Sequence, residues 1–193
     1  MLEIFGVVFG FLYLFLEFKK SNLMWVVGLG MALVYAIVYC QQGVYAYMCF
    51  QIYYILVSIY GFWQWGKDRL AHKNVSSTPD TSPLTYRNIS LKVLLWSAII
   101  YVASTLLMVY VLEGFTDDSM PWADSSVTIL SAIATFWLSK SYREQWLMWM
   151  IVNSLTVIIS IKLSLYPTAL LYSVNTVAAV WGFFYWKKKG VVL

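Results

Sequence analysis

The side chains in this sequence that could do chemistry are few, and most of them lie inside long apolar segments. There is one histidine, His72, in a polar stretch, and there are two cysteines, Cys40 and Cys49, in or beside apolar runs. One histidine and two cysteines cannot assemble a zinc or haem site, and small buried thiols are the ordinary interpretation of such cysteines. The sequence has no Ser/His/Asp group, no glycine-rich phosphate loop and no acid pair within an apolar segment. We therefore expect no enzymatic activity, no metal and no cofactor.

The most specific candidate for ligand binding is the stretch W-L-M-W-M-I-V-N in the second half of the chain. Trp146, Trp149 and Asn153 are spaced i, i+3 and i+7, which places them on one face of a helix. A polar side chain at membrane depth must face the protein interior or a cavity. The spacing predicts that Trp149 and Asn153 contact a substrate, with helix–helix hydrogen bonding as the alternative. Trp146 is the shallowest and is equally consistent with an anchor at the membrane surface.

Other polar side chains occur at comparable depth in two further apolar segments. Gln51 and Tyr54 lie in the third segment, and Tyr172 and Asn175 lie in the last. The complete set predicted to bind a substrate is Gln51, Tyr54, Trp146, Trp149, Asn153, Tyr172 and Asn175.

Composition identifies the elements that must position these residues. The chain of 193 residues is 61% hydrophobic and 11% charged, whereas a soluble domain carries about 25% charged residues. This is the composition of an integral membrane protein, with the lipid bilayer as its surroundings. The basic residues form short clusters between apolar runs, which is typical of membrane-helix flanks and not of a nucleic-acid-binding surface.

Seven segments are long enough to cross a bilayer, for which about 20 apolar residues are needed. We therefore predict an all-α membrane protein with seven transmembrane helices. The residues from 66 to 91 contain two prolines and read as a loop outside the membrane. The predicted spans are approximately 2–18, 23–41, 45–65, 92–112, 122–139, 146–163 and 167–186.

The distribution of positive charge predicts the orientation. With seven spans the termini lie on opposite faces, and 12 of the 13 basic residues fall on the face that carries the C-terminus. Lys162 is the exception. The positive-inside rule then places the N-terminus outside and the C-terminus in the cytoplasm.

The two halves of the chain align without a gap at an offset of 121 residues. Trp25 then matches Trp146, and Gly61 matches Gly182. This predicts two parallel three-helix repeats joined by a linker helix (3+1+3). Parallel repeats place a substrate site at their interface near the middle of the membrane, an architecture typical of transporters. The predicted divisions are a first repeat, a loop with the linker helix and a second repeat with a basic tail, at 1–65, 66–121 and 122–193.

Both repeats end in a similar aromatic stretch, Y-G-F-W-Q-W and W-G-F-F-Y-W, each followed by lysine. We expect the last tryptophan of each, Trp65 and Trp186, to belong to an aromatic belt at the cytoplasmic surface. We expect the glycines to allow close helix packing. Glu17, near the end of the first span, is expected to snorkel to the membrane surface.

Several stretches together resemble the PnuC family of bacterial vitamin transporters. They include L-Y-L-F-L-E-F-K-K, V-Y-A-Y-M-C-F-Q-I-Y-Y-I-L-V-S-I-Y-G-F-W-Q-W, W-A-D-S-S-V-T-I-L-S, R-E-Q-W-L-M-W-M-I-V-N and L-Y-P-T-A-L-L-Y. The resemblance covers nearly the whole chain outside the 66–91 stretch. It implies a fold like that of full-length SWEET transporters in the bacterial inner membrane. It also implies facilitated diffusion of an unphosphorylated vitamin, which a cytoplasmic vitamin kinase then traps.

The resemblance leaves the vitamin open. Family members of the nicotinamide riboside type tend to have an asparagine in the second span, where this chain reads G-L-G-M-A-L, and E-N-W where it reads E-Q-W. These departures favour thiamine, with nicotinamide riboside as the alternative. Both are flat cations, which tryptophan and tyrosine faces attract. A SWEET-like sugar transporter and a receptor or assembly protein are the rival classes, and homo-oligomer formation is left open.

Overall fold

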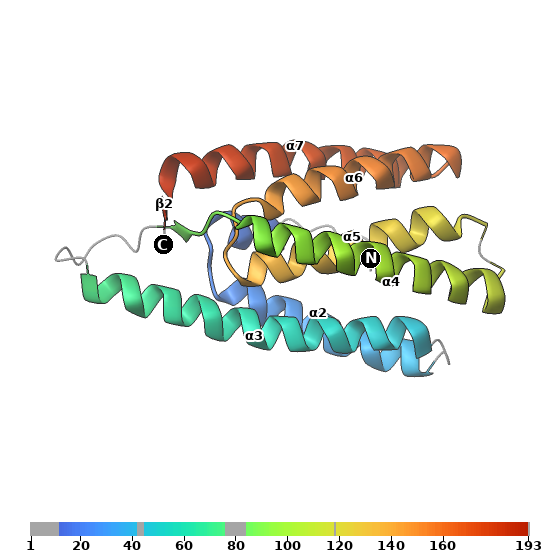
Figure 1. Ribbon diagram of the computed structural model, residues 1–193, viewed down its shortest axis with the longest axis horizontal. Coiled ribbons are helices and arrows are strands. Elements are labelled where there is room, and N and C mark those ends of the chain that lie inside the picture. The colour runs from blue at the N-terminus through green and yellow to red at the C-terminus, as the bar shows by residue number, and fades with distance from the viewer. Residues whose placement is uncertain (1–11, 42–44, 76–83, 118, 193) are drawn as a thin grey trace. The chain divides into compact units, whose positions relative to one another are not determined.

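From a computed structural model of the protein, the structure is described for residues 12–41, 45–75, 84–117 and 119–192, without side-chain detail at 45–47, 49 and 71–75. Residues 12–18 are helical. The remaining elements (Figure 1) are α2 (Leu23–Gln41), α3 (Tyr45–Val75), β1 (Thr85–Tyr86), α4 (Leu91–Phe115), α5 (Pro121–Ser139), α6 (Gln145–Lys162), α7 (Tyr166–Lys189) and β2 (Val191–Val192).

The helices begin and end within a few residues of the predicted spans, with two corrections. First, α3 continues beyond the predicted end at residue 65 as far as Val75, so part of the expected loop is helical. Its extension contains lysine, arginine, leucine and alanine, which favour helix, and no proline. Second, the expected loop contributes the two-residue strand β1, which pairs in parallel with β2 and leaves the fold all-α in class. Most of the first predicted span, and the side chains of Cys49 and His72, lie outside what the structure describes.

Four helices in the described part of the chain, α2, α4, α6 and α7, are long and apolar enough to cross a membrane. In α4, large apolar side chains such as Leu95, Ile99 and Leu107 are exposed around the helix. A helix that is apolar on all sides is suited to lipid and not to water. The protein is therefore a multi-pass membrane protein.

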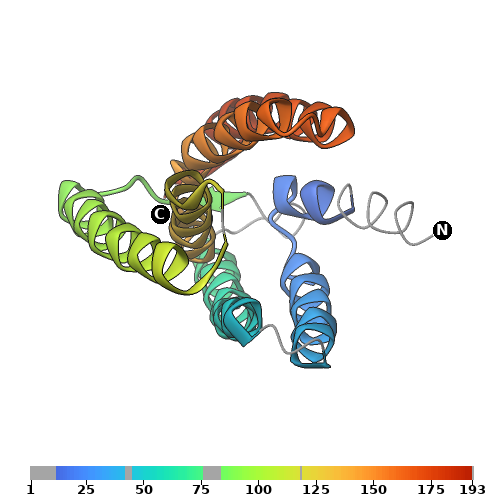
Figure 2. The same ribbon diagram turned by 90° about the vertical axis from the view of Figure 1, so that its right-hand side faces the viewer.

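The chain divides into two compact units. The first contains the residues up to Tyr86 together with Ser139–Ser141 and Lys189–Leu193, and the second contains Arg87–Leu138 and Tyr142–Lys188. In the first unit α2 and α3 lie side by side and run antiparallel (Figures 1 and 2). The predicted division at 1–65, 66–121 and 122–193 stays a prediction.

In the second unit, α4 is fixed to α5 by polar contacts between side chains. Trp137 Nε1 donates to Ser97 Oγ at 3.0 Å, and Tyr101 OH donates to Ser126 Oγ at 3.2 Å. The start of α4 is capped by Ser90, whose hydroxyl accepts from the Val93 N–H. These bonds satisfy polar groups that would be costly in hydrocarbon.

The first unit is held by a tryptophan that packs on a glycine. Trp25 of α2 is 1% exposed, and a Cβ atom added to Gly61 of α3 would collide with its indole ring. Trp65, one turn further along α3, meets Trp25 edge to face, with ring centroids 5.2 Å apart and an interplanar angle of 75°. The two helices can approach this closely only because position 61 has no side chain.

We predict that Gly61→Ala lowers the stability of the purified protein by about 1–3 kcal/mol, because an extra methyl group overpacks the contact with Trp25. Gly30→Ala in α2 is the matched control, since nothing lies within 4 Å of an added Cβ there. Thermal unfolding of both variants in detergent provides the measurement. Equal unfolding midpoints would show that the helix contact does not depend on this glycine.

Candidate functional site

The candidate site is built on α6 and α7, whose contact repeats the arrangement of the first unit. Trp146 is 1% exposed, and a Cβ atom added to Gly182 would lie 2.6 Å from its Cδ2. Trp186 meets Trp146 edge to face, with centroids 5.7 Å apart and an interplanar angle of 85°. The glycines thus allow close packing as predicted. The expectation that Trp65 and Trp186 lie in an aromatic belt is wrong, because both rings are buried against another tryptophan.

The Trp146–Gly182 contact determines which residues of α6 lie beside which residues of α7 further along the two helices. Asn153 lies seven residues after Trp146, and Asn175 lies seven residues before Gly182. Since α6 and α7 are antiparallel (Figure 1), both asparagines lie about 10 Å from the contact. A spacing of seven residues also returns each one to nearly the same helix face. Asn153 and Asn175 therefore lie at about the same level of the two helices.

Trp149, Asn153 and Asn175 form a stripe along the two helices, and its buried polar groups lack partners among the described residues. Asn153 is 6% exposed, and no described residue forms a hydrogen bond with its amide. Trp149, one turn before it, is half-buried, and its Nε1 is buried without a hydrogen-bond acceptor in the described part of the chain. An amide and an indole N–H within an apolar helix need partners.

The other predicted residues are distributed over both units. Tyr172 lies half-buried on α7, and its carbonyl accepts a hydrogen bond from Thr176 Oγ1 at 2.8 Å. Gln51 and Tyr54 are half-buried on α3 in the first unit, where Tyr54 meets Tyr53 edge to face at 5.4 Å. The participation of all seven predicted residues in one site stays a prediction.

The first unit has residues at positions equivalent to Trp149 and Asn153, which the sequence analysis did not single out. At the offset of 121 residues, Trp149 and Asn153 correspond to Gly28 and Ala32. A Cβ atom added to Gly28 would lie 3.5 Å from Ser58 Oγ, in ordinary contact, and Ala32 is buried. The two units therefore share the tryptophan–glycine contact but differ one and two turns away from it. The offset itself was the signal that could have revealed this difference.

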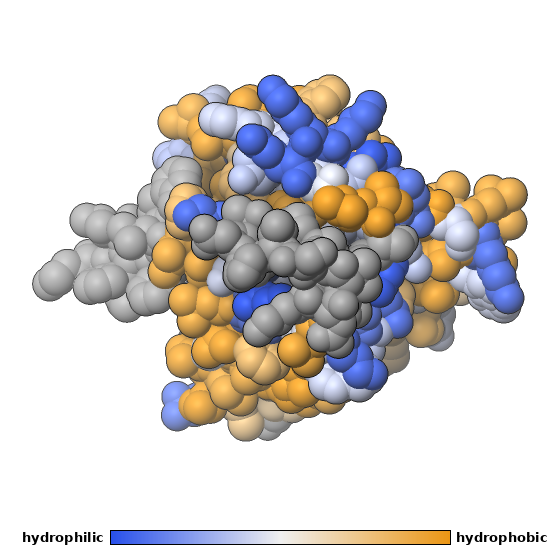
Figure 3. Space-filling view, turned by 90° about the vertical axis from the view of Figure 1, so that its left-hand side faces the viewer, coloured by the Kyte–Doolittle hydropathy of each residue, from blue (hydrophilic) through white to orange (hydrophobic). Residues whose placement is uncertain are grey.

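Other ionisable and metal-binding side chains do not extend this site. Glu17 is 4% exposed, so the expectation that it snorkels to the surface is wrong. Cys40 is an exposed free thiol on α2, contrary to the expected burial. Among the described residues, no three His, Cys, Asp or Glu side chains are grouped as metal ligands. Figure 3 shows hydrophilic side chains gathered around the end of α7, where three consecutive lysines begin at Lys187.

Comparison with known proteins decides the family. A family model described as nicotinamide mononucleotide transporter matches residues 1–188, and matching curated relatives bear the name PnuC. The chain belongs to the PnuC family. The nicotinamide riboside transporter PnuC of Escherichia coli K12 is 24% identical over 96% of this chain and 84% of its own length. The Neisseria mucosa transporter of the same name is 25% identical over 70% of this chain and 52% of its own length.

A solved structure agrees with the fold of this PnuC family member. The crystal structure of the vitamin B3 transporter PnuC matches with a TM-score of 0.67 at 23% identity, covering 94% of this chain and 78% of the other. The family consists of transporters, which supports the expectation that the chain is not an enzyme. The relatives are named for nicotinamide riboside, so they favour the alternative substrate of the sequence analysis over thiamine.

Proposed function

We propose that this protein carries nicotinamide riboside across the membrane by facilitated diffusion. The observation that carries the proposal is the stripe of Trp149, Asn153 and Asn175, in which polar groups without partners among the described residues lie beside an aromatic face. The names of the curated relatives support nicotinamide riboside as the ligand.

The chemistry of the stripe suits a flat cationic ring that carries an amide. An indole face attracts a desolvated cation by about 2 kcal/mol. Asparagine offers both a donor and an acceptor to the amide edge of a nicotinamide ring. No buried carboxylate is required for such a site, which avoids the cost of desolvating a second charge.

The proposed architecture is that of two parallel repeats, 3+1+3, related by the offset of 121 residues. The matching tryptophan–glycine contacts at Gly61 and Gly182 support it. A second correspondence is the left-handed backbone at Lys20 and Ser141, with φ of 50° and 62°, at equivalent positions of the two halves. Gln51 and Tyr54 would contribute from the first repeat. Uptake would be completed by a cytoplasmic kinase that phosphorylates the vitamin.

Thiamine is the second candidate, because α2 has Gly28 and Ala32 in the stretch where transporters of the nicotinamide riboside type tend to have asparagine. Uptake of labelled nicotinamide riboside into liposomes containing the protein separates the two. We expect saturable uptake that excess unlabelled nicotinamide riboside abolishes and excess thiamine reduces little. Uptake equal to that of protein-free liposomes would refute the proposed substrate, and stronger competition by thiamine would reverse the preference.

We predict that Trp149→Ala weakens nicotinamide riboside binding at least tenfold, whereas Trp149→Phe retains part of the affinity because a smaller aromatic face remains. Asn153→Leu is expected to lose binding while the protein stays folded, since leucine suits a membrane helix. Trp181→Ala is the matched control, because its ring on α7 is 69% exposed. Isothermal titration calorimetry tests these variants. Unchanged affinity of Trp149→Ala and Asn153→Leu would place the site elsewhere.

The proposed orientation places the N-terminus outside and the C-terminus in the cytoplasm, on the basis of the 12 basic residues assigned to one face. A reporter enzyme that is active only in the cytoplasm, fused after Leu193, should therefore be active. A reporter that is active only outside the cytoplasm should be silent at the same position. The reverse pair of results would overturn the orientation.

A further inference from the structure

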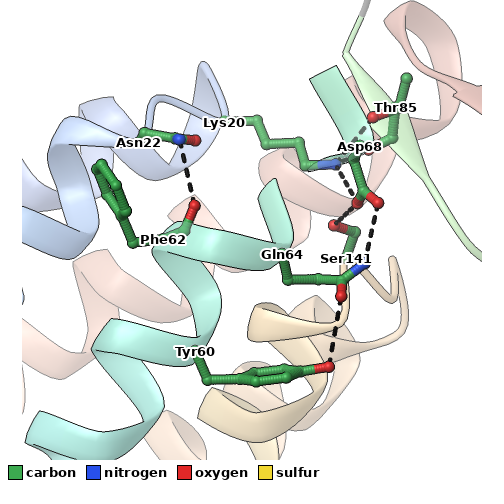
Figure 4. Close-up of polar contacts among 8 residues, drawn as sticks. All are labelled: Lys20, Asn22, Tyr60, Phe62, Gln64, Asp68, Thr85 and Ser141. Atoms are coloured by element: carbon green, nitrogen blue, oxygen red, sulfur yellow. Dashed lines mark hydrogen bonds and ion pairs between the residues drawn. The ribbon is translucent and has the colours of Figure 1, made fainter. Parts of the chain in front are cut away.

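A buried polar cluster in the first unit is not explained by substrate binding. It consists of Lys20, Gln64, Asp68, Thr85 and Ser141, which we call the Asp68 cluster (Figure 4). Asp68 is 4% exposed and Lys20 is 8% exposed. Charges are buried in proteins only where other groups satisfy them, so the contacts of this pair specify a defined arrangement.

Both oxygen atoms of the Asp68 carboxylate accept hydrogen bonds. Gln64 Nε2 donates to Oδ1 at 3.0 Å, and Ser141 Oγ donates to Oδ2 at 2.9 Å. Lys20 Nζ lies 3.5 Å from the same Oδ2. The ammonium group also donates to the Thr85 carbonyl at 2.6 Å and to Thr85 Oγ1 at 2.9 Å. The cluster thus joins four separate stretches of chain, at Lys20, at Gln64 and Asp68, at Thr85 and at Ser141.

Two of these stretches are equivalent turns of the two halves. Lys20 and Ser141 are 121 positions apart, and both have the left-handed backbone described above. Each follows the first helix of its half, and both bind Oδ2 of Asp68. Ser141 belongs to the first unit, whereas the chain on both sides of residues 139–141 belongs to the second. The hydroxyl of Ser141 therefore holds this turn to α3 within the first unit.

Two later segments of the chain belong to the first unit and are held there in different ways. After α7, β2 pairs with β1 through backbone hydrogen bonds, and Val191 N donates to the Leu84 carbonyl at 2.7 Å. The turn at residues 139–141 is held to α3 through side chains: Ser141 Oγ donates to Asp68, and Lys140 Nζ lies 4.7 Å from the centroid of the Tyr60 ring. Side-chain contacts exchange with water more readily than a strand pair, because breaking them frees no backbone group. Of these two segments, the turn is therefore the more readily released.

We propose that the Asp68–Ser141 bond is a latch on the basic face of the transporter, the face that carries the C-terminus and most of the lysines and arginines. The latch is closed in this structure and is released when the substrate pathway opens to that face. This inference rests on the proposed function, since alternating access moves one repeat against the other. Release would loosen the turn at residues 139–141, which the Lys140–Tyr60 contact also holds to α3, while the β1–β2 pair and the Lys20–Thr85 bonds keep the tail and loop in place.

Ser141→Ala removes the latch bond and leaves the ion pair. Ser164→Ala is the matched control, because Ser164 has the same left-handed backbone, with φ of 58°, and is exposed between α6 and α7. Both substitutions therefore have a similar backbone cost. The first readout uses Ser139→Cys in a background with Cys40→Ala and Cys49→Ala, since Ser139 is fully buried.

We expect Ser141→Ala to raise the rate at which a membrane-impermeant maleimide, applied from the basic face, alkylates Cys at position 139 by several-fold. Ser164→Ala should leave that rate unchanged. This readout needs no substrate, so it tests the latch even if nicotinamide riboside is not carried. An unchanged rate in the Ser141→Ala protein would refute the latch.

The second readout links release to transport. In a variant that populates the state open to the basic face, we expect the KM for nicotinamide riboside measured at that face to be several-fold lower. At the other face the KM should be higher or unchanged. Vesicles of the two orientations supply both values, and Vmax/KM must stay equal in the two directions for a passive carrier. Asp68→Asn should shift KM in the same sense. A KM change of the same size and direction on both faces would mean that the cluster only supports the fold.

Discussion

The packing of a tryptophan ring directly on a glycine is the contact on which the rest of this structure depends. Trp25 lies on Gly61 in the first unit and Trp146 lies on Gly182 in the second. Each contact brings two antiparallel helices close enough that any side chain at the glycine would collide with the indole. It also fixes how far along each helix the neighbouring turns meet, and so brings Asn153 level with Asn175. The position of the candidate site follows from a packing constraint outside it.

The same frame carries different side chains in the two units. Beyond the tryptophan–glycine contact, the second unit presents Trp149 and Asn153, whereas the first presents Gly28 and Ala32. An aromatic face and an amide can recognise a ligand, while small residues allow close approach of helices. The Asp68 cluster also differs between the two halves. Lys20 and Ser141, at equivalent positions, both contact the Asp68 carboxylate, whereas the position equivalent to Asp68 in the second half is a lysine, Lys189. The two units thus share a packing contact and differ in the side chains beside it.

Sequence alone predicted most of the helices, because long apolar runs ending in charged residues leave few other structures in a membrane. It also identified Gly61 and Gly182 as packing positions. It failed where tertiary contacts decide: α3 continues to Val75, and Trp65 and Trp186 are buried although their position beside lysines is typical of a membrane belt. The β1–β2 pair and the bonds of Asp68 with Lys20 and Ser141 join residues more than 40 positions apart, and no local pattern indicates such partners.

The central claim is that this PnuC family member is an uncoupled carrier of nicotinamide riboside, and counterflow in liposomes tests it most directly. Liposomes containing the protein are loaded with unlabelled nicotinamide riboside and diluted into a trace of labelled substrate, with no proton or sodium gradient. The account predicts a transient accumulation of label above the outside concentration, because exchange through one alternating site carries label inward while unlabelled substrate leaves. Absence of this overshoot, or accumulation only when an ion gradient is imposed, would contradict the account.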